Sequence, residues 1–141
     1  MNFLSNIIVS ISNGSHAKLD AVVCHLPQLN EFSSIFQILT LLQKQGVIRG
    51  FSYKKKAKYT NENNTKDVFI IYLKYNGSSE SAINSIFIIS KPSRPVYVKT
   101  GSFWQPQTSS GFFVISTKYG IITDIEARRF NLGGCLLFGV T

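Results

Sequence analysis

The chain has 141 residues, of which 44% are hydrophobic and 16% charged, and its 15 Lys and Arg against 7 Asp and Glu give a formal net charge of +8. This length and hydrophobic content allow a buried core without disulfides or metals, and they exclude an intrinsically disordered protein. The excess of cations indicates a polyanionic partner, most often nucleic acid, although a basic protein without such a partner would have the same composition.

Two amphipathic helices are expected in the first half of the chain. The first follows a stripe of apolar residues, Phe3, Leu4, Ile7, Ile8 and Ile11, and we expect Asn13-Gly14 to end it because this pair tolerates the left-handed conformation. The second begins near Asn30, a suitable cap, and stops at Lys44 and Gly46. Its helical spacing predicts a core-facing stripe, rather than a partner surface, made of Phe32, Ile35, Phe36, Leu39 and Leu42.

The remaining segments predict strands. In the first half they cover residues 21–26, 47–59 and 68–75, and the last two pair as a hairpin. In the second half they cover residues 83–89, 96–99, 112–117, 120–123 and 135–140, with a loop at 101–111. One short helix, residues 124–131, is capped by Thr123 and has Asp124 and Glu126 in its first turn.

This order of elements predicts an α+β fold of two small modules, joined near residues 76–82. The N-terminal module, residues 1–78, is a helix–strand–helix–hairpin unit. The C-terminal module, residues 79–141, is rich in strands and has the one short helix.

An enzyme is not expected. The sequence lacks a phosphate-binding glycine loop between a strand and a helix, since "NLGGCLL" opens a strand. Cys24 and His25 are neighbours in a strand and point to opposite faces, so they cannot act together on a substrate. The cysteines and histidines form neither a disulfide framework nor a metal-ligand pattern. We therefore expect no catalytic residues, metal, cofactor or small-molecule substrate, and a reducing compartment.

Membrane and targeting signals are also not found. No stretch reaches the about 20 apolar residues that a membrane-spanning helix needs. No Lys or Arg precedes Lys18, which predicts neither a secretory signal nor an Arg-rich import presequence.

RNA binding fits the residue types best, because cations bind phosphates, hydroxyls bind phosphate or 2′-OH groups, and aromatic rings stack on bases. The candidate residues are Lys54, Lys55 and Lys56 in a basic run that continues to Lys58; Lys91, Arg94 and Tyr97 around two prolines; Ser116, Thr117, Lys118 and Gly120 in a tight turn; and Arg128 and Arg129 on the short helix. Each group has an alternative. The lysine run is also typical of a solvated edge strand, Ser116 and Thr117 of an ordinary turn, and Tyr97 of core or cross-strand packing.

The arrangement resembles the S8 family of small-ribosomal-subunit proteins. Bacterial members carry S-R-P-G-x-R-x-Y, S-T-S-x-G, T-D-x-x-A-R and G-G-E motifs. This chain has Ser90-Lys91-Pro92…Tyr97, Ser116-Thr117-Lys118-Tyr119-Gly120, Thr123-Asp124…Ala127-Arg128 and Gly133-Gly134 in the same order. The resemblance implies a structural ribosomal protein that binds the central domain of small-subunit ribosomal RNA during assembly, beside neighbouring small-subunit proteins. It also implies that Tyr97, Ser116, Thr117 and Gly120 contact the RNA. The alternative is a free-standing RNA-binding regulator on the same fold.

Three departures from the family pattern indicate a divergent member. Lys118 stands where the family has a third hydroxyl, Cys135 replaces the usual acid after the double glycine, and "GSFWQPQTSSG" replaces a helix. Residues with AT-rich codons, such as Phe, Ile, Lys, Tyr and Asn, are frequent. These features favour a mitochondrial protein of the matrix mitoribosome, encoded within the organelle; the alternatives are the bacterial cytoplasm and the plastid.

Overall fold

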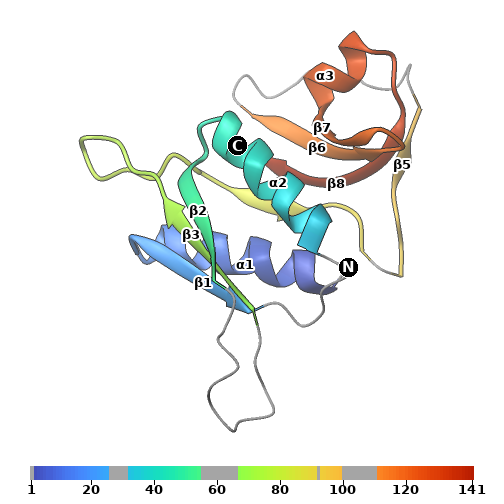
Figure 1. Cartoon of the computed structure of the whole chain (residues 1–141). Coiled ribbons are helices and arrows are strands. Elements are labelled where there is room, and N and C mark those ends of the chain that lie inside the picture. Colours follow the sequence, from blue (N-terminus) through green and yellow to red (C-terminus); the bar gives the residue numbers. More distant parts are fainter. Residues whose placement is uncertain (1, 26–31, 55–66, 92, 100–110) are drawn as a thin grey trace, which may run out of the picture. The chain divides into compact units, whose positions relative to one another are not determined.

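The computed structural model describes residues 2–25, 32–54, 67–91, 93–99 and 111–141. The chain divides into two compact units, one made of Phe3–Ala82 and one that contains Ile83–Thr141. Both combine helices with antiparallel sheets, so the predicted α+β fold is confirmed (Figure 1).

The N-terminal unit is a three-stranded antiparallel sheet covered on one face by two helices. Its elements are α1 (Asn2–His16), β1 (Ala21–His25), α2 (Phe32–Lys44), β2 (Ile48–Lys54) and β3 (Val68–Leu73), and the strand order is β1-β3-β2. Alternate residues of β3 are buried, as a half-covered strand requires. One of them, Phe69, contacts Phe32 of α2, and another, Leu73, lies near Gly14 of α1. Both helices therefore pack on the same face of the sheet.

The first helix is longer than the sequence predicts. It continues through Asn13-Gly14 to His16, and the left-handed residue that follows it is Lys18, at φ 56°. Gly14 is buried at a close contact, because a Cβ added there would lie 2.5 Å from Cγ2 of Val22. The absence of a side chain at Gly14 thus allows β1 to lie close to α1. The prediction that this glycine ends the helix is wrong.

The buried stripe of α2 also differs from the prediction. Phe36 is 46% exposed and Phe32 is half-buried, whereas Ile38 and Leu41 join Ile35 among the buried residues. Phe36 still contacts the ring of Phe51, with centroids 5.5 Å apart, at the margin of the core. The expectation that Phe36 is a core residue is therefore wrong.

The C-terminal unit is a five-stranded antiparallel sheet with one short helix. Its elements are β4 (Ile86–Ile88), β5 (Tyr97–Val98), β6 (Phe112–Thr117), β7 (Gly120–Thr123), α3 (Asp124–Arg129) and β8 (Gly134–Val140). The order is β4-β8-β6-β7, and β5 also pairs with β8. The predicted bounds of β6 and β7 are confirmed, and Thr123 caps α3 by accepting a hydrogen bond from the N–H of Glu126 at 3.3 Å. Among the described residues, no helix is long and apolar enough to cross a membrane.

Candidate RNA interface

Three strands of the C-terminal unit contribute one residue each to a row on one face of the sheet. Cys135 of β8 pairs with Tyr97 of β5 on one side and with Ser116 of β6 on the other. Residues paired directly across antiparallel strands point to the same face, with Cβ atoms about 4.5–5.5 Å apart. The row Tyr97–Cys135–Ser116 therefore brings together two residues that the sequence predicted as site residues.

The row lies on the face of the sheet opposite to α3. The next residues along the strands, Val98, Leu136 and Ile115, point the other way and pack with Ala127 of α3. In the row, Ser116 and Cys135 are half-buried and Tyr97 is 76% exposed. The alternative that Tyr97 belongs to the core is wrong, because its ring is open to solvent.

Gly134 allows β8 to approach β6 closely beside the row. A Cβ added at Gly134 would lie 2.2 Å from the carbonyl oxygen of Ser116 and 3.0 Å from its carbonyl carbon. No side chain fits in this space, and backbone atoms cannot rotate away as a side chain would. Sequence reasoning noticed the double glycine only as part of a family motif and missed this role.

The turn after the row gives two neighbouring hydroxyls different roles. The hydroxyl of Thr117 donates to the carbonyl oxygen of Gly120 at 2.8 Å and accepts from the N–H of Tyr119 at 3.2 Å. Gly120 has a φ of 130°, which an L residue rarely adopts. Thr117 is therefore a turn former, as one interpretation of the sequence had it, whereas Ser116 lies in the row.

Lys118 and Tyr119 form the tip of this turn. Both are exposed, Tyr119 by 72%. Nζ of Lys118 lies 4.9 Å from the centroid of the Tyr119 ring, which is the geometry of a cation–π pair. The tip thus presents a cation and an aromatic ring together, in a position where the family pattern has a third hydroxyl.

Two further cations come from the segment that leads into β5. Lys91 and Arg94 are exposed, and their backbones exchange two hydrogen bonds of 3.0 and 3.3 Å, which closes a tight turn. Ser90, immediately before them, is buried and bonds to the backbone of β8 and to Val96. Sequence reasoning quoted Ser90 within its motif without assigning it a role.

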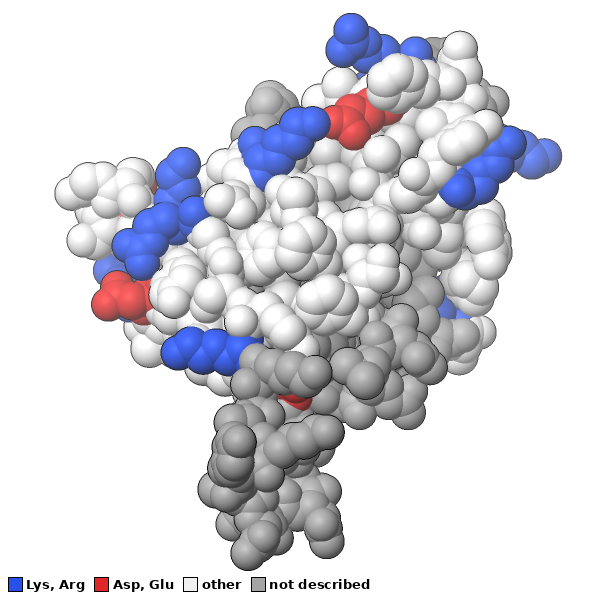
Figure 2. All heavy atoms as spheres, viewed as in Figure 1, with Lys and Arg blue, Asp and Glu red and all other residues white. Residues whose placement is uncertain are grey.

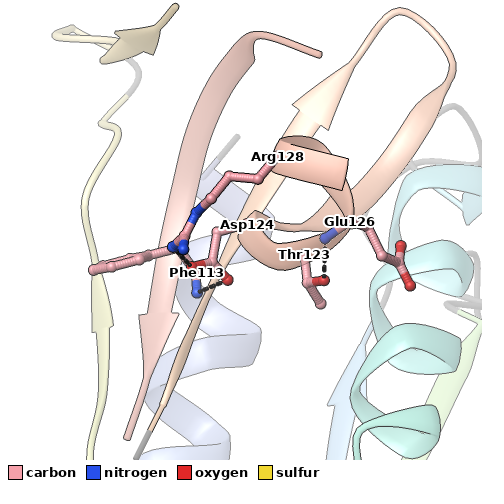
Figure 3. A network of polar contacts seen from close by, with 5 residues as sticks. All are labelled: Phe113, Thr123, Asp124, Glu126 and Arg128. Carbon is pink, nitrogen blue, oxygen red and sulfur yellow. Dashed lines mark hydrogen bonds and ion pairs between the residues drawn. The ribbon is translucent and has the colours of Figure 1, made fainter. Parts of the chain in front are cut away.

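Arg128 contributes to the interior of the unit. Its Nη2 lies 2.9 Å from Oδ2 of Asp124, whose other oxygen, Oδ1, accepts from the N–H of Phe113 at 3.2 Å (Figure 3). Asp124 is only 2% exposed, so its carboxylate depends on these partners. The sequence predicted Asp124 only as a helix-terminus acid, and the structure shows that it also joins α3 to β6. Arg128 is half-buried, whereas Arg129 is exposed.

The basic run of the N-terminal module is only partly described. Lys54, the last residue of β2, is exposed, and Lys55, Lys56 and Lys58 lie outside the described residues. Figure 2 shows that lysine and arginine side chains stand at separate places on the face drawn.

The two cysteines lie in different units, Cys24 in β1 and Cys135 in β8. Cys24 is buried and His25 is exposed, so they point to opposite faces of β1 as expected. Burial raises the pKa of the Cys24 thiol, and a hydrogen bond with Ser10 opposes this shift in part. Both cysteines are free thiols. In the described parts of the chain, no three His, Cys, Asp or Glu side chains gather as they would around a metal ion.

Comparison with known proteins identifies the family. The model of the family "Ribosomal protein S8" matches residues 2–140, nearly the whole chain. The chain belongs to the ribosomal protein S8 family.

Relatives named small ribosomal subunit protein uS8 agree with this assignment. The chain is 33% identical to the Bdellovibrio bacteriovorus protein over 137 residues, or 97% of each chain. It is 32% identical to the Zymomonas mobilis protein over 134 residues, or 95% of this chain and 92% of the other. The protein of Syntrophus aciditrophicus is 41% identical over 100 residues, or 71% of each. The resemblance inferred from the motifs is thereby confirmed. Ribosomal protein S8 is a structural ribosomal protein, so the expectation that the chain is not an enzyme is also confirmed.

Proposed function

We propose that this S8-family chain is a structural constituent of the small ribosomal subunit, and that its C-terminal unit binds small-subunit ribosomal RNA. The observation that carries the proposal is the row Tyr97–Cys135–Ser116, because it aligns an exposed aromatic ring with a half-buried hydroxyl on the face of the sheet opposite to α3. RNA is recognised by such pairs, since unstacked bases stack on aromatic rings and 2′-OH groups bond to small polar groups.

The candidate residues have different roles in this proposal. Tyr97 stacks on a base, Ser116 bonds to a sugar or phosphate, and Lys118 binds a phosphate at the turn tip. Thr117 and Gly120 shape the turn that carries Lys118, and the exposed Lys91, Arg94 and Arg129 add phosphate contacts.

The support for RNA contact differs between Arg128 and the lysines of the basic run. Because Arg128 is paired with the buried carboxylate of Asp124, its main contribution is to hold α3 in place. Lys54, Lys55 and Lys56 remain a proposal that rests on their charge in sequence, with the solvated edge strand as its alternative.

The RNA and protein partners follow from the family. The proposed RNA target is the central domain of the small-subunit ribosomal RNA, bound early in assembly. The proposed protein partners are the neighbouring proteins of the small subunit. Sedimentation tests this role. The tagged chain should migrate with the small subunit at high salt, and the central-domain RNA should compete for the purified chain better than an unrelated helix of equal length. Migration apart from the subunit, with binding to a messenger RNA, would favour the regulator on the same fold.

For the compartment, we propose the mitochondrial ribosome. Two features support this compartment. The composition is rich in residues that have AT-rich codons, and Lys118 and Cys135 stand at positions where the family pattern has other residues. The relatives named above are bacterial, and the bacterial cytoplasm is the alternative that fits them. Cell fractionation with an antibody against the chain decides between them. Recovery in the matrix supports the proposal, and recovery with cytoplasmic or plastid ribosomes contradicts it.

A further inference from the structure

The hydroxyl of Ser90 joins two backbone segments inside the C-terminal unit. Ser90 is 6% exposed. Its Oγ donates to the carbonyl oxygen of Leu136 in β8 and accepts from the N–H of Val96 at 3.0 Å. The same oxygen lies 3.4 Å from Sγ of Cys135, the middle residue of the row. One buried side chain therefore links β8 with the residue immediately before Tyr97.

Strand β5 is short, and its buried packing comes from Val98, which lies against the cluster of Ile115 and Ala127. It consists of Tyr97 and Val98 alone, paired with Cys135 and Gly134. The ring of Tyr97 is 76% exposed, so little side-chain packing holds this residue. Val96 is held from both sides, because its carbonyl oxygen accepts from the N–H of Leu136 at 2.8 Å and its N–H donates to Ser90.

We propose that Ser90 is a positioning residue that holds Tyr97 in the row for RNA binding, an inference that rests on the proposed function. Without the hydroxyl, the N–H of Val96 loses its acceptor, and a two-residue strand pairs weakly. Tyr97 then moves among several positions, and RNA binding has to order it at a cost in affinity. Ser90 itself is buried and does not touch RNA.

A double-mutant cycle tests this coupling. The affinity for central-domain RNA is measured for wild type, Ser90→Ala, Tyr97→Ala and the double variant. We expect Ser90→Ala to weaken binding about threefold to tenfold when Tyr97 is present, the range of one hydrogen bond. In the Tyr97→Ala background the same change should have almost no effect. Ser90→Thr, which keeps the hydroxyl, should bind like wild type. A parallel cycle combines Ser90→Ala with Lys118→Gln, on the turn tip. The losses of affinity of these two variants should be additive.

Hydrogen exchange in the free protein supplies a readout without RNA. Loss of the Ser90 hydroxyl should speed exchange of the Val96 amide, while amides of the β6–β8 ladder keep their protection. If Ser90→Ala does not fold, Ser90→Cys under reducing conditions replaces it, because a thiol fills the site and forms only weak hydrogen bonds.

The outcomes separate this inference from the proposed function. No binding of central-domain RNA by wild type would overturn the proposed function and the inference with it. Normal wild-type binding, with Ser90→Ala equally costly whether or not Tyr97 is present, would overturn only the positioning role. Unchanged exchange of Val96 in the variant would overturn it as well.

Discussion

The carbonyl oxygen of Ser116 occupies the space that a side chain at Gly134 would need, since a Cβ added there would lie 2.2 Å away. This contact lies where β6 and β8 meet beside the row, so the spacing of the two strands at the proposed RNA face depends on a residue without a side chain.

Replacing Gly134 should lower both the stability of the protein and its affinity for RNA. We expect Gly134→Ala to destabilise the protein by about 1–3 kcal/mol, because the contacting atoms are backbone and only strand separation relieves them. Gly77→Ala is the matched control, since an added Cβ there meets nothing within 4 Å. Urea unfolding of both variants gives the comparison, and an equally small effect at the two positions would show that the strands can move apart freely.

The buried carboxylate of Asp124 should contribute more to the stability of the protein than a second carboxylate in the same helix. Asp124→Asn weakens the bonds to Arg128 and to the N–H of Phe113, and we expect a loss of about 1–3 kcal/mol. Glu126→Gln removes the same charge from the first turn of α3 and should cost under about 1 kcal/mol. Thermal unfolding measures both, and equal losses would contradict the larger contribution to stability expected of the buried carboxylate.

Two phenylalanines of the N-terminal unit should differ in their contribution to stability. Phe69 is fully buried, so Phe69→Ala should cost about 3–5 kcal/mol. Phe36 is 46% exposed, so Phe36→Ala should cost only about 1–2 kcal/mol from the smaller apolar area it buries. Urea unfolding again provides the measurement. A larger loss for Phe36 would place it in the core, as the helical spacing alone predicts.

Salt dependence should distinguish the hydroxyl of the row from the cation at the turn tip. Ser116→Ala should weaken binding to the cognate RNA and reduce discrimination against unrelated helices, with little change in the slope of log K against log salt. Lys118→Gln should weaken binding to all RNAs and make that slope shallower by about one unit, because one phosphate contact is lost. Lys74→Gln, an exposed lysine of the other unit, controls for the change in net charge. Normal affinity and selectivity in a folded Ser116→Ala variant would refute the place given to Ser116.

Much of the fold follows from local patterns in the sequence. The bounds of β6 and β7 and the cap at Thr123 were predicted correctly, because alternation along a strand and a capping hydroxyl are properties of a few adjacent residues. The family was also predicted, since the motifs lie in order along the chain.

Only the tertiary structure decided which residues share a surface. Ser116 and Thr117 are adjacent in sequence, yet one lies in the row and the other closes a turn. Tyr97, Cys135 and Ser116 are far apart in sequence, yet the register of three strands places them side by side. For the same reason, two local predictions were wrong: periodicity assigned Phe36 to the core, and the tolerance of Asn13-Gly14 for the left-handed conformation predicted the end of a helix there. Periodicity shows which side chains of one element share a face, but burial and cross-strand contact depend on what another segment places against that face.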